Sequence, residues 1–261
     1  MRILEWKAFL EEGLPVDDGL AAMSVGVFDG VHRGHKALIE RILYRKNQSL
    51  PVVVTFRQNH KTSRPVYFGN ISSFRQKTAI FESMGVAVTI VADLSESFRR
   101  ISGTEFFRLL WERGKMGFLA IGSNFRCGFN QDTDAELIQK INASQGIPTE
   151  IVQTLTEDNE PISSNRIRRI IHDGKLREAA VMLGRPFTLD VDSESFSEAG
   201  NSSTVLDIAR LGFVLPPPGK YKVLLHVKNG GSKQVQIQIE EEQIHIPAFS
   251  GGQNIQLEFI C

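Results

Sequence analysis

The chain has 261 residues and a balanced charge, with 30 lysines and arginines against 30 aspartates and glutamates. Composition therefore gives no reason to expect nucleic acid or a membrane surface as a partner, and any anion must be bound by a local cluster. No stretch approaches the roughly 18 apolar residues of a membrane span, and residues 1–7 lack the apolar core of a signal peptide. The two cysteines, Cys127 and Cys261, form neither a disulfide framework nor a metal-site spacing. We expect a cytoplasmic protein with one large or two modest domains.

The first strong pattern is an apolar run at residues 21–28, which has the length and composition of a buried strand. Asp29 and Gly30 interrupt this run, and a helical pattern begins after Gly34. A strand, a glycine-containing turn and a helix in this order aim backbone N–H groups and the positive end of a helix at an anion. The pattern therefore predicts an anion site at this turn.

Two histidines, His32 and His35, stand three residues apart in the same turn. Imidazole groups donate hydrogen bonds to phosphate oxygens and stabilise the charge that develops on them. The spacing alone leaves open a surface pair or a metal-binding pair. A phosphate site is thus one of several interpretations of the two histidines taken by themselves.

Strand and helix patterns alternate from residue 50 to residue 152. This alternation predicts right-handed β-α-β units and a parallel sheet with helices on both faces. Ligands of such sheets bind at the carboxyl ends of the strands, so we expect the turn at 29–34, the loop after Phe56 and the loop after Gly122 to meet at one edge. The predicted strands are residues 50–56, 86–91, 118–122 and 148–152, and the predicted helices are residues 74–83, 95–115 and 134–145.

A second polar stretch follows at residues 162–174. It begins with Ser163 and Ser164, which are good helix caps, and it sets Arg166 and Arg168 near the N-terminus of a predicted helix. An isolated arginine cluster is usually a solvated basic face. Hydroxyl groups, a positive helix end and guanidinium groups together make an anion site, and this is the interpretation we favour.

From residue 188 the composition becomes polar and rich in strand-forming residues. Alternating apolar residues at 221–227 and 235–239, joined through residues 229–231 (N-G-G), predict a hairpin. Residues 244–246 and 255–259 predict two more strands, and the acidic stretch at 193–203 predicts a mobile loop. A small antiparallel barrel or sandwich fits this pattern.

Three motifs together resemble a known family. Residues 25–35, V-G-V-F-D-G-V-H-R-G-H, closely resemble G-x-F-D-G-V-H-x-G-H, the nucleotide-binding signature of bacterial FAD synthetases. Residues 162–168, I-S-S-N-R-I-R, look like the family's I-S-S-T-x-I-R, which binds the ATP phosphates. Residues 122–128, G-S-N-F-R-C-G, are similar to its G-x-[DN]-F-x-F-G segment, which lies near both substrates. The resemblance extends over residues 20–187.

The resemblance implies an α/β fold: a Rossmann-like H-x-G-H nucleotidylyltransferase domain at residues 1–187, followed by a small antiparallel β domain at 188–261 that resembles a degenerate riboflavin kinase barrel. The implied reaction converts ATP and FMN into FAD and pyrophosphate, with Mg²⁺ bridging the phosphates. No residue is expected to ligate a metal directly. The implied catalytic residues are His32, His35, Asn124 and Arg168; the nucleotide-binding residues are Gly26, Phe28, Gly30, Gly34, Ser163, Ser164 and Arg166; the flavin-binding residues are Phe56, Asn124 and Phe125.

The chain departs from the family pattern at four places, the first of which is Asn165 in place of the threonine of I-S-S-T-x-I-R. Residues 55–60 read T-F-R-Q-N-H where the family has T-F-D-P-H-P, and Cys127 stands where phenylalanine is usual. Residues 215–221 resemble the strand entry of the kinase barrel, but its G-x-x-L-G-x-P-T-A-N segment is missing, and residues 204–209 occupy roughly its place. We therefore expect no riboflavin kinase activity.

Three alternatives remain open at this point. One is a bifunctional riboflavin kinase and FAD synthetase. Another is a related adenylyl- or cytidylyltransferase that acts on a different phosphate acceptor, because the H-x-G-H core is common to that superfamily. The third is a nucleotide- or flavin-binding module without turnover.

Overall fold

The structure is a computed structural model that describes residues 1–14, 19–57, 68–92, 96–192, 196–197, 203–227, 231–249 and 254–260. The chain forms two compact units. The first comprises Met1–Asn59 and Lys77–Pro161, and the second comprises His60–Gln76 and Ile162–Cys261. Residues 162–187 belong to the second unit because Ile167, Leu183 and Phe187 are buried in its core. The functional division into domains 1–187 and 188–261 stays a prediction.

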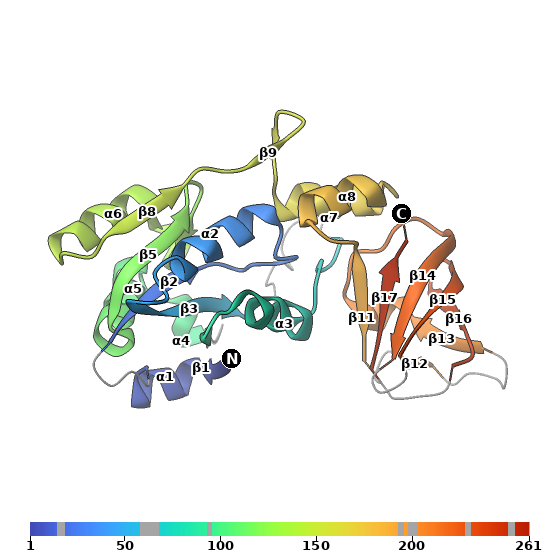
Figure 1. The fold of residues 1–261 in the computed structure, drawn as a ribbon, viewed down its shortest axis with the longest axis horizontal. Coiled ribbons are helices and arrows are strands. Elements are labelled where there is room, and N and C mark those ends of the chain that lie inside the picture. Colours follow the sequence, from blue (N-terminus) through green and yellow to red (C-terminus); the bar gives the residue numbers. More distant parts are fainter. Residues whose placement is uncertain are drawn as a thin grey trace. The chain divides into compact units, whose positions relative to one another are not determined.

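A six-stranded parallel sheet forms the centre of the first unit (Figure 1). Its strand order is β1-β4-β3-β2-β5-β8, and every neighbouring pair is parallel. The predicted parallel sheet is therefore confirmed. Val52, Val53 and Val54 of β3 are fully buried, as expected for a central strand covered on both faces. The strands are β1 (Arg2–Glu5), β2 (Leu20–Val25), β3 (Ser49–Phe56), β4 (Val88–Ala92), β5 (Met116–Gly122) and β8 (Thr149–Val152).

Helices cover both faces of this sheet. One face is packed by α2 and α3, through Ile39, Ile42 and Phe81. The other face is packed by α1, α5 and α6, through residues such as Phe9 and Ile138. Each helix buries the apolar stripe that the predicted β-α-β units require. The helices are α1 (Trp6–Glu12), α2 (Arg33–Leu43), α3 (Phe74–Met84), α4 (Glu96–Arg99), α5 (Gly103–Gly114) and α6 (Ala135–Ser144). None of the described helices is long and apolar enough to cross a membrane.

Two local expectations need correction. The single helix predicted over residues 95–115 is wrong, because α4 and α5 are separate. Ser102 lies in extended backbone between them, and its hydroxyl accepts a hydrogen bond from the N–H of Glu105 at 3.1 Å, which starts a new helix. The sequence patterns also missed β1 and α1; β1 adds to the sheet edge in parallel with β4, where Arg2 pairs with Val88.

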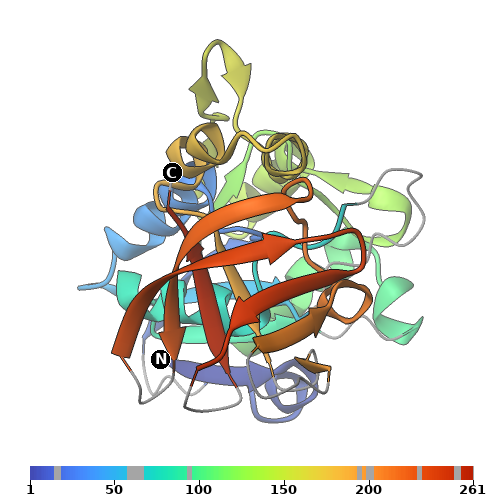
Figure 2. The ribbon, with the colours of Figure 1, turned by 90° about the vertical axis from the view of Figure 1, so that its right-hand side faces the viewer.

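The second unit is built on a seven-stranded antiparallel sheet, which curls in Figure 2. Its strand order is β11-β17-β14-β15-β16-β13-β12. The predicted hairpin is confirmed, since β14 pairs with β15 out to Val227 and Gly231; its turn, residues 228–230, lies outside the described residues. Of the predicted loop 193–203, the structure describes only β12 and the first residue of β13. The elements are α7 (Ser164–His172), α8 (Leu176–Leu183), β11 (Thr188–Val191), β12 (Phe196–Ser197), β13 (Ser203–Asp207), α9 (Ile208–Leu211), β14 (Gly219–Val227), β15 (Gly231–Ile239), β16 (Gln243–Pro247) and β17 (Ile255–Phe259).

A short segment ahead of α3 is held by the second unit. The backbone of Asn70 forms a parallel bridge with Phe213. The guanidinium of Arg75 and the hydroxyl of Ser73 donate to the buried carboxylate of Asp190, which Arg75 binds through two nitrogens. The side chain of Gln76 donates to the carbonyl of Thr188 at 2.9 Å. These bonds explain why the boundary between the units falls inside α3.

Candidate functional site

The turn between β2 and α2 has an unusual backbone. Strand β2 ends at Val25, three residues earlier than predicted, and three of the following residues have positive φ: Phe28 at 53°, Gly30 at 77° and Val31 at 37°. Positive φ suits glycine but is strained for phenylalanine and valine. The side chains of Phe28 and Val31 are both fully buried. Burial of these two side chains therefore holds the turn in a shape that the chain would not otherwise adopt.

Phe28 organises the base of this turn. Its ring packs edge-on against His35, with centroids 5.2 Å apart, and against Phe81, with centroids 5.6 Å apart. A Cβ atom at Gly26 would lie 3.2 Å from the Phe28 ring, so glycine at this position leaves room for it. Gly26 and Phe28 thus support the turn, and a direct contact of either with a nucleotide stays a prediction.

The two histidines form a stacked pair at the start of α2. His32 caps the helix, and its Nδ1 accepts a hydrogen bond from the backbone N–H of His35 at 3.3 Å. The two rings are nearly parallel, with centroids 3.6 Å apart. A Cβ atom at Gly34 would lie 3.2 Å from the His32 ring, so glycine at this position leaves room for the ring. Because Nδ1 of His32 is an acceptor, the neutral ring carries its proton on Nε2.

His35 holds a polar atom that needs a partner. Within the described residues, its Nδ1 is a buried side-chain nitrogen without a hydrogen-bond partner. Burial, followed by the nearby His32 and the positive charge of Lys77, lowers the pKa of His35 well below 6.5. The ring is therefore neutral at pH 7. A buried polar atom without a partner costs on the order of 1–3 kcal/mol, and a ligand that supplies the partner would remove that cost.

Lys77 of α3 also belongs to this site. It is 5% exposed, and its ammonium donates to the carbonyls of Val27 at 3.0 Å and Phe56 at 2.7 Å. The Val27 carbonyl also accepts from the hydroxyl of Thr55 at 3.1 Å. Burial lowers the pKa of Lys77 to about 8, although the negative charge of Asp29 acts in the opposite direction. Lys77 therefore places a buried positive charge between the ends of two neighbouring strands.

The sequence interpretation missed Lys77, but the sequence contained a signal. Lys77 lies three and four residues before Ile80 and Phe81, which pack against the sheet. A lysine within the apolar stripe of an amphipathic helix faces the core of the protein together with the apolar residues of that stripe. Buried lysines are rare unless they are paired, so the position itself marks a site that requires explanation.

The loops after β3 and β5 end at the same edge of the sheet as the histidine turn, because β3 and β5 both pair in parallel with β2. Asn124 is exposed in the loop after β5. The two predicted flavin-binding rings turn partly inward: Phe125 packs edge-on against Phe107 at 6.0 Å, and Phe56 against Phe98 at 6.1 Å. Their contact with flavin, and that of Asn124, stays a prediction. Residues 58–60 of the altered motif lie outside the described residues.

Cys127, where the family has phenylalanine, is a packing residue in this chain. It lies in β6 (Arg126–Cys127), which pairs with β7 (Thr133–Asp134). A Cβ atom at Gly103 would lie 2.9 Å from the Cys127 sulfur, so the thiol packs against the start of α5. Burial, assisted by the negative charge of Asp132, raises the pKa of Cys127 to about 12. The thiol therefore stays protonated and unreactive at neutral pH.

Arg33, the variable residue of the H-x-G-H motif, is paired. Its guanidinium lies 2.5 Å from the carboxylate of Glu157. Glu157 belongs to a small hairpin of β9 (Thr156–Glu157) and β10 (Glu160–Pro161), whose turn contains Asp158 and Asn159 at positive φ. The ion pair fastens this hairpin to the first turn of α2, a link that the sequence analysis did not predict.

The predicted helix with Ser163, Ser164, Arg166 and Arg168 is α7, in the second unit. The hydroxyl of Ser163 accepts from the N–H of Arg166 at 3.2 Å, which confirms the expected cap. Arg168 is 2% exposed, and its guanidinium donates to the carbonyl of Gly69 and the side chain of Asn165, each at 2.8 Å. Ser164 and Arg166 are partly exposed. That these residues meet the histidine turn around one ligand stays a prediction.

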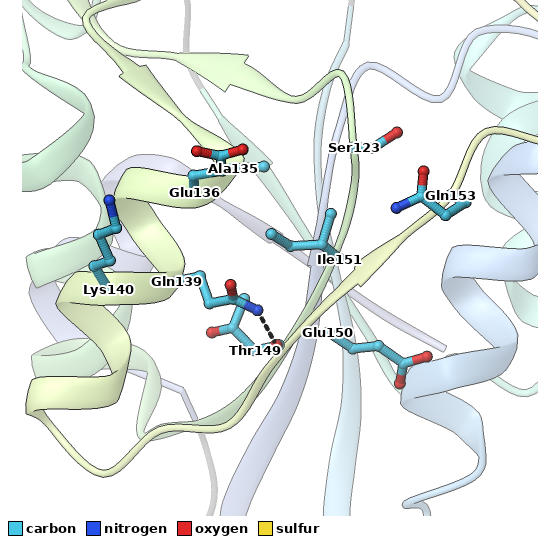
Figure 3. A pocket seen from close by; sticks show the side chains of 9 residues that line it. All are labelled: Ser123, Ala135, Glu136, Gln139, Lys140, Thr149, Glu150, Ile151 and Gln153. Carbon is cyan, nitrogen blue, oxygen red and sulfur yellow. Dashed lines mark hydrogen bonds between the residues drawn. The ribbon is translucent and has the colours of Figure 1, made fainter.

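A separate hollow of about 600 Å³ lies between α6 and the edge strand β8 (Figure 3). Ile151 points into it, and the side chain of Gln139 crosses from α6 to donate to the carbonyl of Thr149 at 3.1 Å. Glu136 and Lys140 of α6 and Ser123, the neighbour of Asn124, complete part of its wall. The residues that line this hollow include neither of the two histidines nor Lys77. The turn after β2 is therefore the better candidate for the phosphate-binding site.

A family model described as FAD synthetase matches residues 15–166. The chain belongs to the FAD synthetase family. The matched region contains the histidine turn, Lys77, the loop after β5 and the start of α7. This confirms the family resemblance drawn from the motifs.

Curated relatives agree with this membership, and one solved structure shares the fold. The chain is 28% identical over 176 residues to the bifunctional riboflavin kinase/FMN adenylyltransferase of Escherichia coli K12. The aligned region covers 64% of this chain and 55% of that protein. The chain thus matches little more than half the length of that relative. It is 23% identical over 237 residues to the FAD synthetase of Listeria monocytogenes, covering 88% and 93%. A macrolide-efflux protein from Streptococcus pneumoniae has the same fold, with a TM-score of 0.79, 22% identity and coverage of 99% and 90%.

Proposed function

We propose that this member of the FAD synthetase family transfers an adenylyl group from ATP to FMN and so produces FAD and pyrophosphate. The observation that carries the proposal is the histidine pair at the start of α2. Its rings are stacked, and the buried Nδ1 of His35 has no hydrogen-bond partner among the described residues. A polyphosphate seated at the positive end of α2 is a ligand whose chemistry suits these groups.

In the proposed reaction, a phosphate oxygen of FMN attacks the α-phosphorus of ATP. A new bond forms between that oxygen and the α-phosphorus, while the bond from the α-phosphorus to the bridging oxygen breaks and pyrophosphate leaves. A phosphate monoester is ionised near neutral pH, since its second pKa is about 6, so no general base is needed. Catalysis then consists of positioning and of stabilising charge in an in-line displacement.

Each site residue has a role in this scheme. His32 and His35 contact the α- and β-phosphates, and the neutral His35 ring supplies a hydrogen bond to the charge that develops on the leaving group. The left-handed backbone at Gly30 brings N–H groups close to the phosphates. Asn124 orients the reacting groups. Ser163, Ser164 and Arg166 at the N-terminus of α7 contact the polyphosphate, as the family resemblance implies, and the buried Arg168 supports α7 through its bonds to Gly69 and Asn165.

Mg²⁺ is proposed to enter bound to ATP, because this ion prefers phosphate oxygens and water. It would reduce the repulsion between the ATP phosphates and the incoming FMN phosphate. Among the described residues, the structure shows no group of three or more His, Cys, Asp or Glu side chains that would hold a metal. A cytoplasmic location, which the sequence analysis predicted, belongs to the same proposal.

The β domain of the second unit is proposed to have no riboflavin kinase activity. The support is the missing P-T-A-N segment; residues 204–209, which occupy roughly its place, form most of β13 and the first two residues of α9. The seven-stranded sheet is retained as a folded unit with its own core. We propose that this unit contributes α7 and structural support rather than phosphoryl transfer.

The deciding experiment is chromatographic analysis of purified protein incubated with Mg-ATP and either FMN or riboflavin. FAD from FMN and no product from riboflavin is the expected result. FAD or FMN from riboflavin would show that the β domain is an active kinase. No FAD from FMN would refute the proposal and point to another phosphate acceptor or to a binding module.

A matched pair of variants ties the activity to the site. His35→Ala removes the ring with the unpartnered nitrogen. His245→Ala removes a partly exposed histidine of β16. FAD formation lost in the first variant and retained in the second would exclude a contaminating enzyme as its source.

A further inference from the structure

The strongest unexplained feature of the histidine turn is the buried ammonium of Lys77. Its two acceptors are the carbonyls of Val27, just beyond β2, and Phe56, at the end of β3. These strands are parallel neighbours at the centre of the sheet. An ammonium that is 5% exposed loses most of its hydration, so the fold retains this charge at a cost where a methionine would fill the same space.

We propose that Lys77 is a positioning residue of the adenylyl-transfer site, whose ammonium ties the ends of β2 and β3 together and fixes a positive charge behind the histidine turn. The inference rests on the proposed function and adds a residue to it. The two hydrogen bonds of Lys77, here called the clamp, hold the carbonyl of Val27, from which the strained turn begins. The positive charge of Lys77 adds to the electrostatic potential that attracts an incoming polyphosphate. In a site with little water such a charge acts more strongly than at the surface.

The groups that face Lys77 support this arrangement. Asp29 of the turn, itself 5% exposed, attracts the ammonium. His35 of α2 lies within its electrostatic reach, and His32 stacks on His35. From β3 the neighbouring polar group is the hydroxyl of Thr55, which is uncharged. Lys77 therefore helps to keep His35 neutral, so that the ring acts as a hydrogen-bond partner of the phosphates rather than as a second buried cation.

A purely structural clamp is the competing explanation, and Thr55 provides the control for it. Thr55 donates to the same Val27 carbonyl without carrying a charge. Thr55→Val therefore weakens the clamp and leaves the charge in place. Lys77→Met removes both, whereas Lys77→Arg keeps the charge. Lys7→Met, at an exposed lysine of α1 whose side chain is 88% exposed, controls for loss of a lysine elsewhere in the same unit.

The experiment measures kcat, and KM for Mg-ATP and for FMN, in these four variants and the wild type from about pH 6 to about pH 9.5. We expect Lys77→Met to lower kcat at least about tenfold at pH 7, and we expect Thr55→Val and Lys7→Met to stay within about threefold of the wild type. Lys77→Arg should recover part of the loss.

The pH profile separates the charge from the clamp. The Lys77 pKa of about 8 means that the wild type loses the charge as the pH rises through this value. Its kcat should therefore fall above about pH 8, and Lys77→Met should lack this decrease. An equal loss of kcat in Lys77→Met and Thr55→Val, or an alkaline decrease that persists in Lys77→Met, would overturn the inference.

Two further measurements cover failed outcomes. The thermal unfolding curve shows whether Lys77→Met folds. If it does not, the inference is tested by the alkaline decrease of kcat in the wild type and by the activity of Lys77→Arg. A wild-type kcat that does not decrease near pH 8 overturns the inference. If the wild type forms no FAD, the proposed function has failed, and calorimetric binding of inorganic pyrophosphate tests Lys77 separately. If pyrophosphate binds the folded Lys77→Met variant at least about tenfold more weakly than the wild type, the charge of Lys77 contributes to polyphosphate binding. An unchanged affinity refutes that contribution.

Discussion

The two motifs that predicted phosphate binding differ in how their polar groups are used. Both start a helix, and both cap it: His32 accepts from a backbone N–H of α2, and Ser163 does the same in α7. At the histidine turn a buried nitrogen of His35 is left without a partner among the described residues. In α7 the buried guanidinium of Arg168 already donates to Gly69 and Asn165.

This difference separates a group that awaits a ligand from a group that supports the fold. His35 is held in place by stacking and by aromatic packing, and its unpartnered nitrogen is buried. Arg168 contributes to the packing of α7 against the segment at Gly69. Two motifs that both predict phosphate binding therefore differ in the folded chain: one contains a polar group without a partner, and the other contains one that stabilises the fold. Mutagenesis can test this difference.

The largest effect is expected at His35. His35→Ala should lower kcat for FAD formation at least about a hundredfold, because it removes a preorganised group that stabilises developing charge. The measurement is steady-state turnover at saturating Mg-ATP and FMN. Near-normal turnover in this variant, with the fold verified by circular dichroism, would refute the role assigned to the ring.

Arg168 should affect stability more than its exposed neighbour. Arg168→Met should lower the free energy of unfolding by about 2 kcal/mol, since the Gly69 carbonyl and the Asn165 side chain lose a charged donor. Arg169→Met, at an exposed position of the same helix, should change it by less than about 0.5 kcal/mol. Urea unfolding measures both. Unchanged stability in Arg168→Met together with a raised KM for Mg-ATP would assign Arg168 to phosphate binding instead.

The low pKa of His35 predicts a stability change in acid. Below pH 6.5 the unfolded chain binds a proton at this ring that the folded chain excludes, so the free energy of unfolding falls as the pH falls. Between pH 7.5 and pH 5.5 this amounts to at most about 1.4 kcal/mol. His35→Gln should show a smaller decrease over the same range in urea unfolding. An identical pH dependence in both proteins would show that His35 has the same pKa in the folded and unfolded states.

The helix cap of α7 should give the smallest effect. Ser163→Ala should lower the free energy of unfolding by about 1 kcal/mol, because the N–H of Arg166 loses its acceptor. Ser163→Asn, which keeps a capping oxygen, should recover most of the loss. If phosphate also binds the Ser163 hydroxyl, Ser163→Asn will restore the stability but not the KM for Mg-ATP.

Elements with local signals could be predicted from the amino-acid sequence alone. Apolar runs without a polar break gave the central strands of the parallel sheet, alternation gave β14 and β15, and the serine before α7 gave its cap. The histidine turn and the family were also readable, because G-x-F-D-G-V-H-x-G-H is a contiguous motif. In each case the physical preference is set by residues within one turn or one strand of each other.

Features that depend on partners far apart in the chain became visible only in the folded structure. The ammonium of Lys77 bonds to carbonyls 50 and 21 residues away, and the guanidinium of Arg168 to a carbonyl 99 residues away. Edge strand β1 forms only because β4 offers it a parallel partner. Whether a charged side chain is solvated, committed to the fold or left for a ligand depends on which groups surround it after folding, and local sequence does not specify those groups.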